Sequence, residues 1–403
     1  MNVLVVNSGS SSLKLSLLDR EYRRIATRTV QPWTTGEATP VIEFLRPLPP
    51  VATVGHRFVH GGPSLAEPVV IDDTIRAELG SLTELAPLHH RRAIDALDAA
   101  RAALPGVPHI ACFDTAFHAD LPQAAATYAV PRAWRDRWNL RKYGFHGLSH
   151  ASVARQVPEL LQRPRDTVRI VSAHLGAGAS LCAIDGGRSV DTTMGFTPLD
   201  GLVMATRCGS VDPGMLLWLL REDRLDLESL SDGLERRSGL AGLSELPHRA
   251  SDMRAVRQAA ERGDQRARLA VDVYVHRLRA GIAAMAAAMN GMDVLAFTGG
   301  IGEHDAVLRN DVTNGLRFLG VAIDKVSNAH CLPGTDISAP GGSTRVVVVA
   351  AEEDIEVARH ARAAAIETLV ACRDRPSTMP DRPVTVGPRP LPGTPPPLTG
   401  SSV

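Results

Sequence analysis

Lysine is scarce in this sequence of 403 residues: only Lys14, Lys142 and Lys325 occur, and arginine supplies the rest of the positive charge. None of the three is followed by serine or threonine. A P-loop holds the phosphates of a nucleotide with a Gly-Lys-Ser or Gly-Lys-Thr step. The sequence therefore excludes a P-loop, and any nucleotide must be held by other means.

Cysteine is scarce as well, and its spacing is irregular. The five cysteines lie far apart and form no Cys-x-x-Cys pair; they are Cys112, Cys182, Cys208, Cys331 and Cys372. Disulfide-rich domains and structural zinc sites show regular, closely spaced cysteines. We therefore expect reduced thiols in a reducing, cytoplasmic compartment.

Net charge and long apolar runs are absent. The 44 basic residues balance the 44 acidic ones, which argues against a nucleic acid or a membrane as a partner held by bulk charge. No uncharged apolar stretch approaches the roughly 20 residues of a membrane span. The first apolar run, residues 3–6, precedes the first basic residue, Lys14, whereas a secretory signal begins with positive charge.

The length of the chain predicts two domains, because a single core rarely grows beyond about 250–300 residues. Near the C-terminus the composition changes: nine prolines occur between residues 376 and 397 without apolar periodicity. Such a segment has too few apolar groups to offset the entropy of ordering. We expect a disordered tail over residues 372–403.

The first 14 residues predict a hairpin that binds phosphate. Residues 3–6 are a short β-branched run typical of a buried strand, and residues 8–12 form a turn of serine and glycine followed by Lys14. Backbone N–H groups, hydroxyls and a nearby lysine can converge on a phosphate there, because no bulky side chain intervenes. An ordinary tight turn would look the same, so this segment alone leaves both interpretations open.

A second hairpin of the same kind is predicted at residues 169–184, where Ser180 and Leu181 align with Ser12 and Leu13. The chain is therefore expected to be internally duplicated. A third glycine turn, residues 298–303, follows an apolar strand and precedes an expected helix over residues 305–316. This position suits a ligand at a helix N-terminus.

Ionisable residues recur beside apolar residues and glycine in several further segments: residues 54–62 (VGHRFVHGG), 113–118 (FDTAFH), 143–150 (YGFHGLSH) and 206–209 (TRCG). A single such segment is readily explained by a structural ion pair or a core histidine. A series of them favours a functional site.

With these segments the chain resembles the acetokinase family of acetate kinases. The segments that carry the resemblance are NSGSSSLK, GHRFVHGG, LAPLH, FDTAFH, YGFHGLSH, HLGAG, TTMGFTPLDGL, TRCG, VDPG, SGLAGLS, SDMR, FTGGIGE and a late EED, in order from Met1 to about Ala371. The family belongs with actin, the heat-shock chaperones and the sugar kinases.

The resemblance implies an α/β fold of duplicated actin-like (ribonuclease H-like) domains with a nucleotide cleft between them. It implies an N-terminal domain of residues 1–116 plus about 356–371, a C-terminal nucleotide-binding domain of residues 117–355, and a homodimer. It also implies reversible phosphoryl transfer from ATP to acetate, which gives ADP and acetyl phosphate, a precursor of acetyl-CoA.

This chemistry requires positive charge and alignment rather than a general base, because acetate is already an anion that must approach a triphosphate. Guanidinium groups hold carboxylate and phosphoryl oxygens bidentately. The resemblance implies four catalytic residues: Arg57, Asp114, His146 and Arg207. Arg57 and Arg207 would flank the reacting groups, His146 would donate to an equatorial phosphoryl oxygen, and Asp114 would orient an arginine or a magnesium-bound water, or serve only as a structural partner.

The remaining site residues also follow from the resemblance. Asn7 and Glu353 match the magnesium positions, which Mn²⁺ could also occupy. The acyl pocket would be lined by Arg57, Val59, Leu88, Phe145 and Pro198. The positions that match the nucleotide site are Ser10, Ser12, Lys14, His174, Leu175, Gly176, Ala177, Gly178, Asp252, Met253, Arg254, Gly299, Gly300, Ile301, Gly302 and Glu303.

Two departures from the family pattern bear on activity. Ala177 replaces an asparagine, which removes a hydrogen-bond donor near the phosphates, and Ser210 replaces an aspartate close in sequence to Arg207. The charge-neutralising residues remain, so we expect an active kinase with altered constants for nucleotide or substrate. The alternatives are a propionate or other short-chain carboxylate kinase, an ATP-dependent switch, and a weakly active pseudoenzyme.

Overall fold

The computed structural model describes residues 1–9, 12–33, 36–221, 224–246 and 252–373, without the side chains of residues 87, 88, 369 and 371–373. The chain divides into two compact units, Met1–Ala365 and Ile366–Val403. The contacts that define the fold lie in the first unit. Of the predicted tail, residues 372 and 373 are the end of a helix, and residues 374–403 lie outside the described residues.

The first sheet has six strands in the order β3-β2-β1-β4-β6-β5. Their bounds are β1 (Val3–Ser8), β2 (Leu13–Leu18), β3 (Arg24–Val30), β4 (Thr53–Phe58), β5 (Val69–Val70) and β6 (His109–Phe113). Strands β1, β2 and β3 form an antiparallel meander, and β4 and β6 continue the sheet parallel to β1. The short β5 closes the edge antiparallel to β6.

The second sheet repeats this topology, which confirms the predicted duplication. Its strands are β7 (Arg169–Leu175), β8 (Ala179–Asp185), β9 (Arg188–Thr192), β10 (Val294–Thr298), β11 (Thr335–Asp336) and β12 (Arg345–Val348), in the order β9-β8-β7-β10-β12-β11. The meander β7-β8-β9 is again antiparallel, β10 and β12 are parallel to β7, and β11 is antiparallel. In each sheet the central parallel strands end at one edge, where ligands of α/β proteins bind.

Helices and short 3₁₀ turns connect the strands. The helices are α1 (Thr39–Leu45), α2 (Asp73–Ser81), α3 (Pro87–Ala103), α4 (Gln123–Ala126), α5 (Arg132–Trp138), α6 (Gly147–Leu161), α7 (Pro213–Leu220), α8 (Leu227–Arg236), α9 (Gly239–Ser244), α10 (Met253–Glu261), α11 (Gln265–Ala288), α12 (Gly299–His304), α13 (Ala306–Asn314), α14 (Lys325–His330) and α15 (Glu353–Arg373). The 3₁₀ turns are η1 (Leu82–Leu85), η2 (Ala116–His118), η3 (Arg165–Thr167) and η6 (Arg317–Leu319). Among the described residues no helix combines the length and the apolar character of a membrane span.

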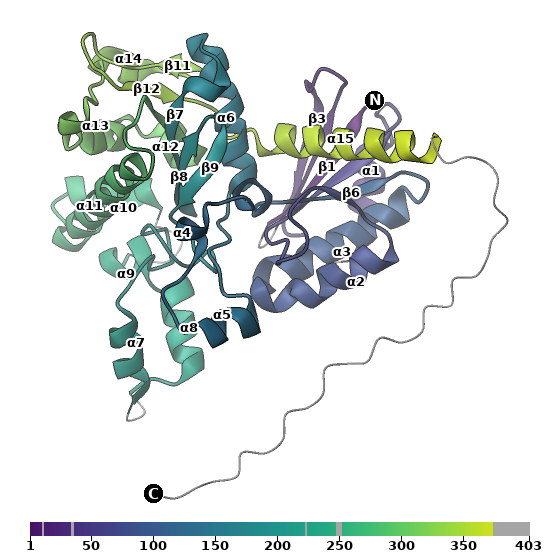
Figure 1. Ribbon diagram of the computed structural model, residues 1–403, viewed down its shortest axis with the longest axis horizontal. Helices are drawn as coiled ribbons and strands as arrows, with labels where there is room; N and C mark the ends of the chain where they lie inside the picture. The colour runs from purple at the N-terminus through teal and green to yellow at the C-terminus, as the bar shows by residue number, and fades with distance from the viewer. Residues whose placement is uncertain (10–11, 34–35, 222–223, 247–251, 374–403) are drawn as a thin grey trace, which may run out of the picture. The chain divides into compact units, whose positions relative to one another are not determined.

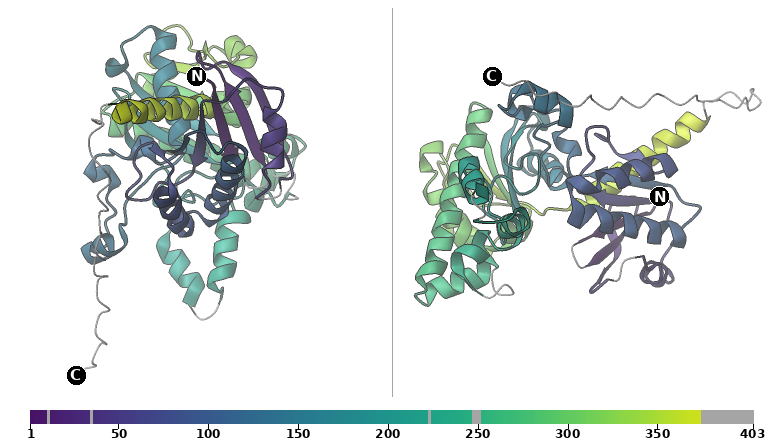
Figure 2. Two further views of the ribbon diagram at one scale, coloured as in Figure 1. Left: turned by 90° about the vertical axis from the view of Figure 1, so that its right-hand side faces the viewer. Right: turned by 90° about the horizontal axis from the view of Figure 1, so that it is seen from below.

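Helices cover both faces of the first sheet, which explains the uninterrupted apolar run of β1, since a strand buried on both faces needs no alternation. Helix α3 packs against one face, and the first part of α15 packs against the other (Figure 1). Figure 2 shows from two further sides the first part of α15, drawn in yellow, next to the purple strands of this sheet. A Cβ on Gly55 would lie 2.7 Å from Val357, so glycine in β4 allows the close approach of α15.

Helix α6 contacts the cores of both sheets. Leu148, in its first turn, belongs to the apolar cluster of the first sheet, whereas Val153 and Val157 belong to a cluster of the second sheet. His146 precedes α6 in the left-handed conformation, with φ of 55°. Non-glycine residues rarely adopt this conformation, and it occurs here at a residue predicted to be catalytic. The other face of the second sheet is covered by α11.

Two details of the hairpins and turns differ from the sequence predictions. The closing pair of the first hairpin is Ser8 with Leu13, and that of the second is Leu175 with Ala179, so the alignment of Leu13 with Leu181 was wrong by two residues. The segment predicted as a third glycine turn is helix α12, and the helix that follows, α13, is shorter than expected.

Candidate active site

A cavity of about 300 Å³ lies where the first sheet meets the segments before α6 and after β9. Its wall consists of Asn7, Ser8, Gly9, Ser12, Lys14, Arg57, Val59, His89, Ala93, Asp114, Phe145, His146, Pro198 and Arg207. Asn7, Arg57 and Asp114 come from the ends of β1, β4 and β6, which are adjacent parallel strands. Because the carboxyl ends of parallel strands meet at one edge, residues far apart in the sequence converge there.

Two carboxylates surround the guanidinium of Arg57. Nε and Nη2 of Arg57 donate to the two oxygens of Asp114 at 3.0 and 2.7 Å, and Nη1 donates to Glu353 at 2.6 Å. Asp114 is 1% exposed. Burial alone would lower the pKa of Arg57, but Asp114 and Glu353 outweigh burial and raise it. Desolvation raises the pKa of Asp114, and the paired guanidinium opposes that rise. Arg57 is therefore a fixed, permanently charged group.

The guanidinium of Arg207 lacks such a partner. No carboxylate of the described residues forms an ion pair with it, and its Nη1 donates to the carbonyl oxygen of Pro198 at 2.6 Å. Burial lowers the pKa of Arg207, with Glu235 as the charge that opposes this shift. A half-buried cation with no neutralising carboxylate is an anion-binding group.

His146 faces the same cavity from the residue before α6. Burial, His174, Arg57, His150 and Arg207 all lower its pKa, so the imidazole is neutral. Its ring stacks on that of His174 with 4.4 Å between centroids. A neutral imidazole carries one N–H donor.

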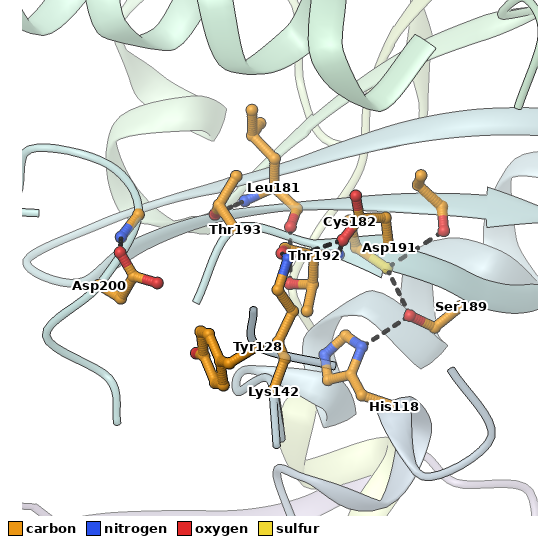
Figure 3. Close-up of polar contacts among 12 residues, drawn as sticks. His118, Tyr128, Lys142, Leu181, Cys182, Ser189, Asp191, Thr192, Thr193 and Asp200 are labelled. Carbon is orange, nitrogen blue, oxygen red and sulfur yellow. Dashed lines mark hydrogen bonds and ion pairs between the residues drawn. The ribbon is translucent and has the colours of Figure 1, made fainter. Parts of the chain in front are cut away.

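A network of polar contacts around His118 and Lys142 (Figure 3) lies beside the segment that leads into His146. Lys142 Nζ donates to Asp191 and to the carbonyl oxygen of Thr192, each at 2.9 Å. His118 donates from Nε2 to the carbonyl oxygen of Phe145 at 3.1 Å, and its Nδ1 takes the hydroxyl proton of Ser189 at 2.7 Å. Burial lowers the pKa of His118 to about 4, which keeps its Nδ1 an acceptor. These contacts therefore fix the segment that leads into His146 from its N-terminal side.

A second cavity, of about 380 Å³, shares Asn7 and Lys14 with the first. Its other wall residues are Val5, Ser16, Arg24, His174, Gly299, Gly300, Glu303, Ala350, Ala351, Glu352, Glu353 and Asp354. They come from both halves of the chain, so this cavity brings the two glycines that begin α12 close to the first hairpin. Arg24 holds Asp354 with two hydrogen bonds of 2.8 and 2.7 Å at its wall.

The two cavities contain most of the predicted catalytic, acyl and metal residues, whereas the predicted nucleotide residues are divided. Those absent from both walls are Leu175, Gly176, Ala177, Gly178, Asp252, Met253, Arg254, Ile301 and Gly302. Gly178 nevertheless lies close by, because a Cβ there would come within 2.9 Å of Arg207 and 3.1 Å of His146. Ser10 and the side chain of Leu88 lie outside the described residues.

Two predicted nucleotide residues have side chains buried in the core, and a third, Glu303, lines the second cavity with its carboxylate bonded to the backbone. The side chains of Leu175 and Met253 lie in the core of the second half. For Leu175 in β7 the reason is that successive strand residues point to opposite faces, so His174 and Leu175 cannot both face a cavity. The carboxylate of Glu303 accepts hydrogen bonds from the backbone N–H groups of Gly299 and Ala351 at 3.0 and 3.1 Å. Glu303 therefore joins the start of α12 to the segment after β12.

Asp252 caps α10, where its carboxylate accepts a hydrogen bond from Ala255 N at 2.8 Å, and Arg254 is exposed. Sequence reasoning missed His89, which lines the first cavity. Burial, followed by Arg207 and Arg57, lowers the pKa of His89 to about 4. The LAPLH segment that contains His89 was the signal that could have found it.

Ser210, the second departure from the family pattern, contacts a carboxylate itself. Ser210 Oγ donates to Asp200 at 2.6 Å, so a carboxylate remains next to this loop, and Pro198 orients Arg207. Ala177 is exposed, and its carbonyl oxygen accepts a hydrogen bond from Ala205 N at 3.1 Å. Its methyl group offers no hydrogen-bond donor, as expected.

The chain thus has two α/β halves of like sheet topology and an arginine-lined cavity. The chain belongs to the acetokinase family, whose model matches residues 42–359.

Individual relatives agree with this assignment. The chain is 44% identical over 391 residues to the acetate kinase of Leifsonia xyli subsp. xyli, a match that covers 89% of this chain and 98% of that protein. The crystal structure of Porphyromonas gingivalis acetate kinase matches with a TM-score of 0.81 at 32% identity, covering 90% and 99% of the two chains. A propionate kinase from Francisella tularensis subsp. tularensis matches with a TM-score of 0.82 at 31% identity, over the same shares.

Proposed function

We propose that this protein is an acetate kinase that transfers the γ-phosphoryl group of ATP to acetate. The observation that carries the proposal is the pairing of a fixed guanidinium, Arg57, with an unneutralised one, Arg207, in one cavity with neutral His146. A carboxylate acceptor and a triphosphate repel each other, and these groups oppose that repulsion without removing a proton. The comparisons support the same activity, since relatives of this chain are acetate kinases.

In the proposed reaction a carboxylate oxygen of acetate attacks the γ-phosphorus, and the bond from that phosphorus to the β–γ bridging oxygen breaks. ADP leaves with the bond electrons, and acetyl phosphate forms. Negative charge spreads over the equatorial oxygens of the transferring group in the transition state. Arg57 and Arg207 would bind these oxygens and the acetate carboxylate, and His146 would donate a hydrogen bond to one equatorial oxygen. Asp114 would keep Arg57 in the orientation that this requires.

The residues at the carboxyl edge of the first sheet fit a magnesium ion. Glu353 uses Oε2 for Arg57, and its Oε1 takes no hydrogen bond from the described residues. The amide of Asn7 faces both cavities, and the buried hydroxyl of Ser8 has no partner among the described residues. No group of three acidic, histidine or cysteine side chains forms a protein-only metal site in the described ranges. Asn7 and Glu353 would hold Mg²⁺ or Mn²⁺. The ion would supply positive charge beside the phosphates, and its remaining ligands would be water and phosphate oxygens.

The acyl group of the substrate is proposed to lie against Val59, Phe145 and Pro198, which are three of the apolar residues of the first cavity wall. Their side chains leave room for a small alkyl group. Propionate is the second candidate acceptor, which the likeness to a propionate kinase favours. One methylene changes discrimination in such a pocket by only about 1–3 kcal/mol.

The test is a hydroxamate assay with ATP, magnesium and either acetate, propionate or butyrate, in which hydroxylamine traps the acyl phosphate. We expect hydroxamate with acetate at the highest kcat/KM. Removing magnesium with EDTA should stop the reaction. ADP release without hydroxamate would indicate an ATP-dependent switch, and neither product would indicate a pseudoenzyme. The Val59→Ala variant should shift the ratio of kcat/KM towards propionate.

We also propose that the protein is a homodimer. Helix α7 exposes four large apolar side chains, Met215, Leu217, Trp218 and Leu220, which are 41%, 58%, 55% and 38% exposed. Exposed apolar patches of this kind mark interaction surfaces. Sedimentation should give twice the mass of the chain, and Leu217→Glu should give monomers.

The proposed domain boundaries are near residues 117 and 356, with residues 1–116 and about 356–371 in the first domain and residues 117–355 in the second. Packing of α15 against the first sheet supports the return of the chain to the first domain.

We place the protein in the cytoplasm, which its substrates and the four free cysteines of the described residues support. Its partners would be acetate and ATP or ADP.

A further inference from the structure

Residues 143–150 contain a second buried histidine, His150, which the proposed reaction does not use. His150 Nε2 lies 2.9 Å from Ser180 Oγ, and the same oxygen lies 2.9 Å from Nδ1 of His146. On its other side, His150 Nδ1 lies 2.8 Å from Ser172 Oγ. His150, Ser172 and Ser180 are fully buried, so water does not complete their hydrogen bonds. These four side chains form one continuous chain of hydrogen bonds that ends at the cavity.

The number of protons restricts how this chain can be arranged. Each hydroxyl carries one proton, and each neutral imidazole carries one proton on either nitrogen. If Ser172 donates to His150 Nδ1, then His150 donates from Nε2 to Ser180, and Ser180 donates to Nδ1 of His146. Every buried proton then has an acceptor, and the proton of His146 is on Nε2.

The reverse arrangement is less favourable. If His146 donates from Nδ1 to Ser180, Ser180 donates to His150, and His150 donates to Ser172, whose own proton has no acceptor among the described residues. Buried polar groups without partners are rare because they cost about 1–3 kcal/mol. The reverse arrangement would also leave a lone pair of Nε2 facing an anionic substrate.

We infer that Ser180, His150 and Ser172 are positioning residues that hold His146 as the tautomer with its proton on Nε2, the nitrogen that faces the cavity. The inference deepens the proposed function, since it explains how a neutral histidine always presents a donor to the transferring phosphoryl group. Ser180 belongs to β8 and Ser172 to β7, whereas both histidines flank or belong to the start of α6. The second sheet thereby fixes the orientation of the imidazole ring of His146, the residue before α6.

The charges around these rings agree with neutral histidines. Burial lowers the pKa of His150 far below its usual value, with His118 and His174 as further causes. His174 Nδ1 and Ser149 Oγ form a separate hydrogen bond of 2.8 Å. His174 therefore does not compete for Ser180.

The first experiment reads the tautomer directly in the unliganded, full-length wild-type protein. Histidine labelled with ¹⁵N and long-range ¹⁵N–¹H correlation spectra distinguish the protonated ring nitrogen, and the His146→Gln variant identifies the signals of His146. We expect protons on Nε2 of both His146 and His150. A proton on Nδ1 of His146, or on both its nitrogens, at neutral pH would overturn the inference. This result does not depend on turnover, so it is separable from a failure to form acetyl phosphate.

The second experiment separates positioning from general stability by kinetics. Ser180→Ala should lower kcat by about 10–100-fold, the usual cost of losing a residue that orients a catalytic group, with KM for both substrates nearly unchanged. In the His146→Gln background, whose amide has no tautomers, Ser180→Ala should cause no further loss. An equal loss in both backgrounds would show a merely structural role and overturn the inference.

The matched control is Ser244→Ala, which removes another buried hydroxyl, bonded to the carbonyl oxygen of Leu240 at 2.7 Å in α9. It should leave kcat unchanged. If Ser180→Ala does not fold, Ser180→Thr retains the hydroxyl and should keep the wild-type tautomer. A change of tautomer in Ser180→Thr together with unchanged kcat would also contradict the inference.

Discussion

Nε2 of His146 and Nη2 of Arg207 both approach Gly178, so closely that a Cβ on this glycine would lie 3.1 Å from the first atom and 2.9 Å from the second. Gly178→Ala should therefore push both groups away from the cavity. A displacement near 1 Å at a reacting centre costs about 100-fold in rate. We expect Gly178→Ala to lower kcat by a similar factor in the hydroxamate assay.

Gly80→Ala is the matched control for Gly178→Ala. Gly80 lies in α2 with no atom within 4 Å of the place its Cβ would occupy. The control should keep the wild-type kcat, and its thermal midpoint should not fall, because alanine is the better helix former. Wild-type kcat in Gly178→Ala would show that His146 and Arg207 do not need their observed positions.

Removing either arginine should abolish acyl phosphate formation, but the two variants should differ in their unfolding free energy. Arg57→Ala leaves the buried Asp114 without its guanidinium, and breaking a buried ion pair costs about 3–5 kcal/mol of unfolding free energy. Arg207→Ala removes a cation that no carboxylate of the described residues pairs with, so its unfolding free energy should stay close to that of the wild type. Urea unfolding of the two variants measures the difference.

Arg57→Lys refines that comparison, because it keeps the charge beside Asp114 while losing the bidentate geometry. It should recover part of the stability and little of the activity. Equal stability of Arg57→Ala and Arg207→Ala would contradict the assigned ion pairs.

Stability should fall as the pH drops from about 6.5 to about 4. Burial lowers the pKa of His60, His89 and His118 to about 4 in the folded protein, while in the unfolded chain each has a pKa of about 6.5. Within this window the unfolded state binds more protons, so unfolding free energy rises with pH by up to about 1.4 kcal/mol per unit for each histidine.

Urea unfolding at pH 5.0 and 6.5 measures this change, and the interval from pH 7 to 8 is the internal control, because these histidines are neutral there in both states. His118→Gln should reduce the slope by one titrating group. A slope that is flat below pH 6.5 would contradict the burial of the three imidazoles.

Ala177→Asn should restore a side-chain donor near the phosphates. Ala177 is exposed beside the turn between β7 and β8, so the larger side chain needs no repacking. A hydrogen bond to a charged group contributes about 1.5–3 kcal/mol at best, and partial exposure reduces this. We expect KM for ATP to fall about threefold to tenfold with kcat nearly unchanged, as measured by initial rates at saturating acetate. An unchanged KM would show that the missing amide does not reach the nucleotide.

Local patterns were sufficient to predict the two hairpins and the duplication, whereas the residues expected at the active site came from the resemblance to a family. The apolar run that becomes β1 and its serine-rich turn are local signals, and the repeat at residues 169–184 shows the same order. Arg57, His146 and Arg207 each stand in a distinctive segment, and the resemblance supplied their common location. These predictions depended on residues that are neighbours in the sequence.

Contacts between distant segments could not be predicted from the same patterns. The hydrogen bond between Arg57 and Glu353 joins residues 296 positions apart, and it depends on the packing of α15 against the first sheet. The orientation of the side chains of β7 could not be predicted either, because a motif does not state which of His174 and Leu175 faces the cavity. The series of hydrogen bonds from Ser172 to His146 could not be predicted, because it forms only where two neighbouring strands and the start of a helix come together.

The positions of helices α6 and α15 have a consequence for the opening of the cavities. His146 directly precedes α6 and Glu353 is the first residue of α15, and both lie on the cavity walls. Atoms at a pivot travel far less than those at the end of a lever. If the halves of the molecule swing about these two helix starts, nucleotide can enter and leave over a wide arc while the imidazole and the carboxylate scarcely move.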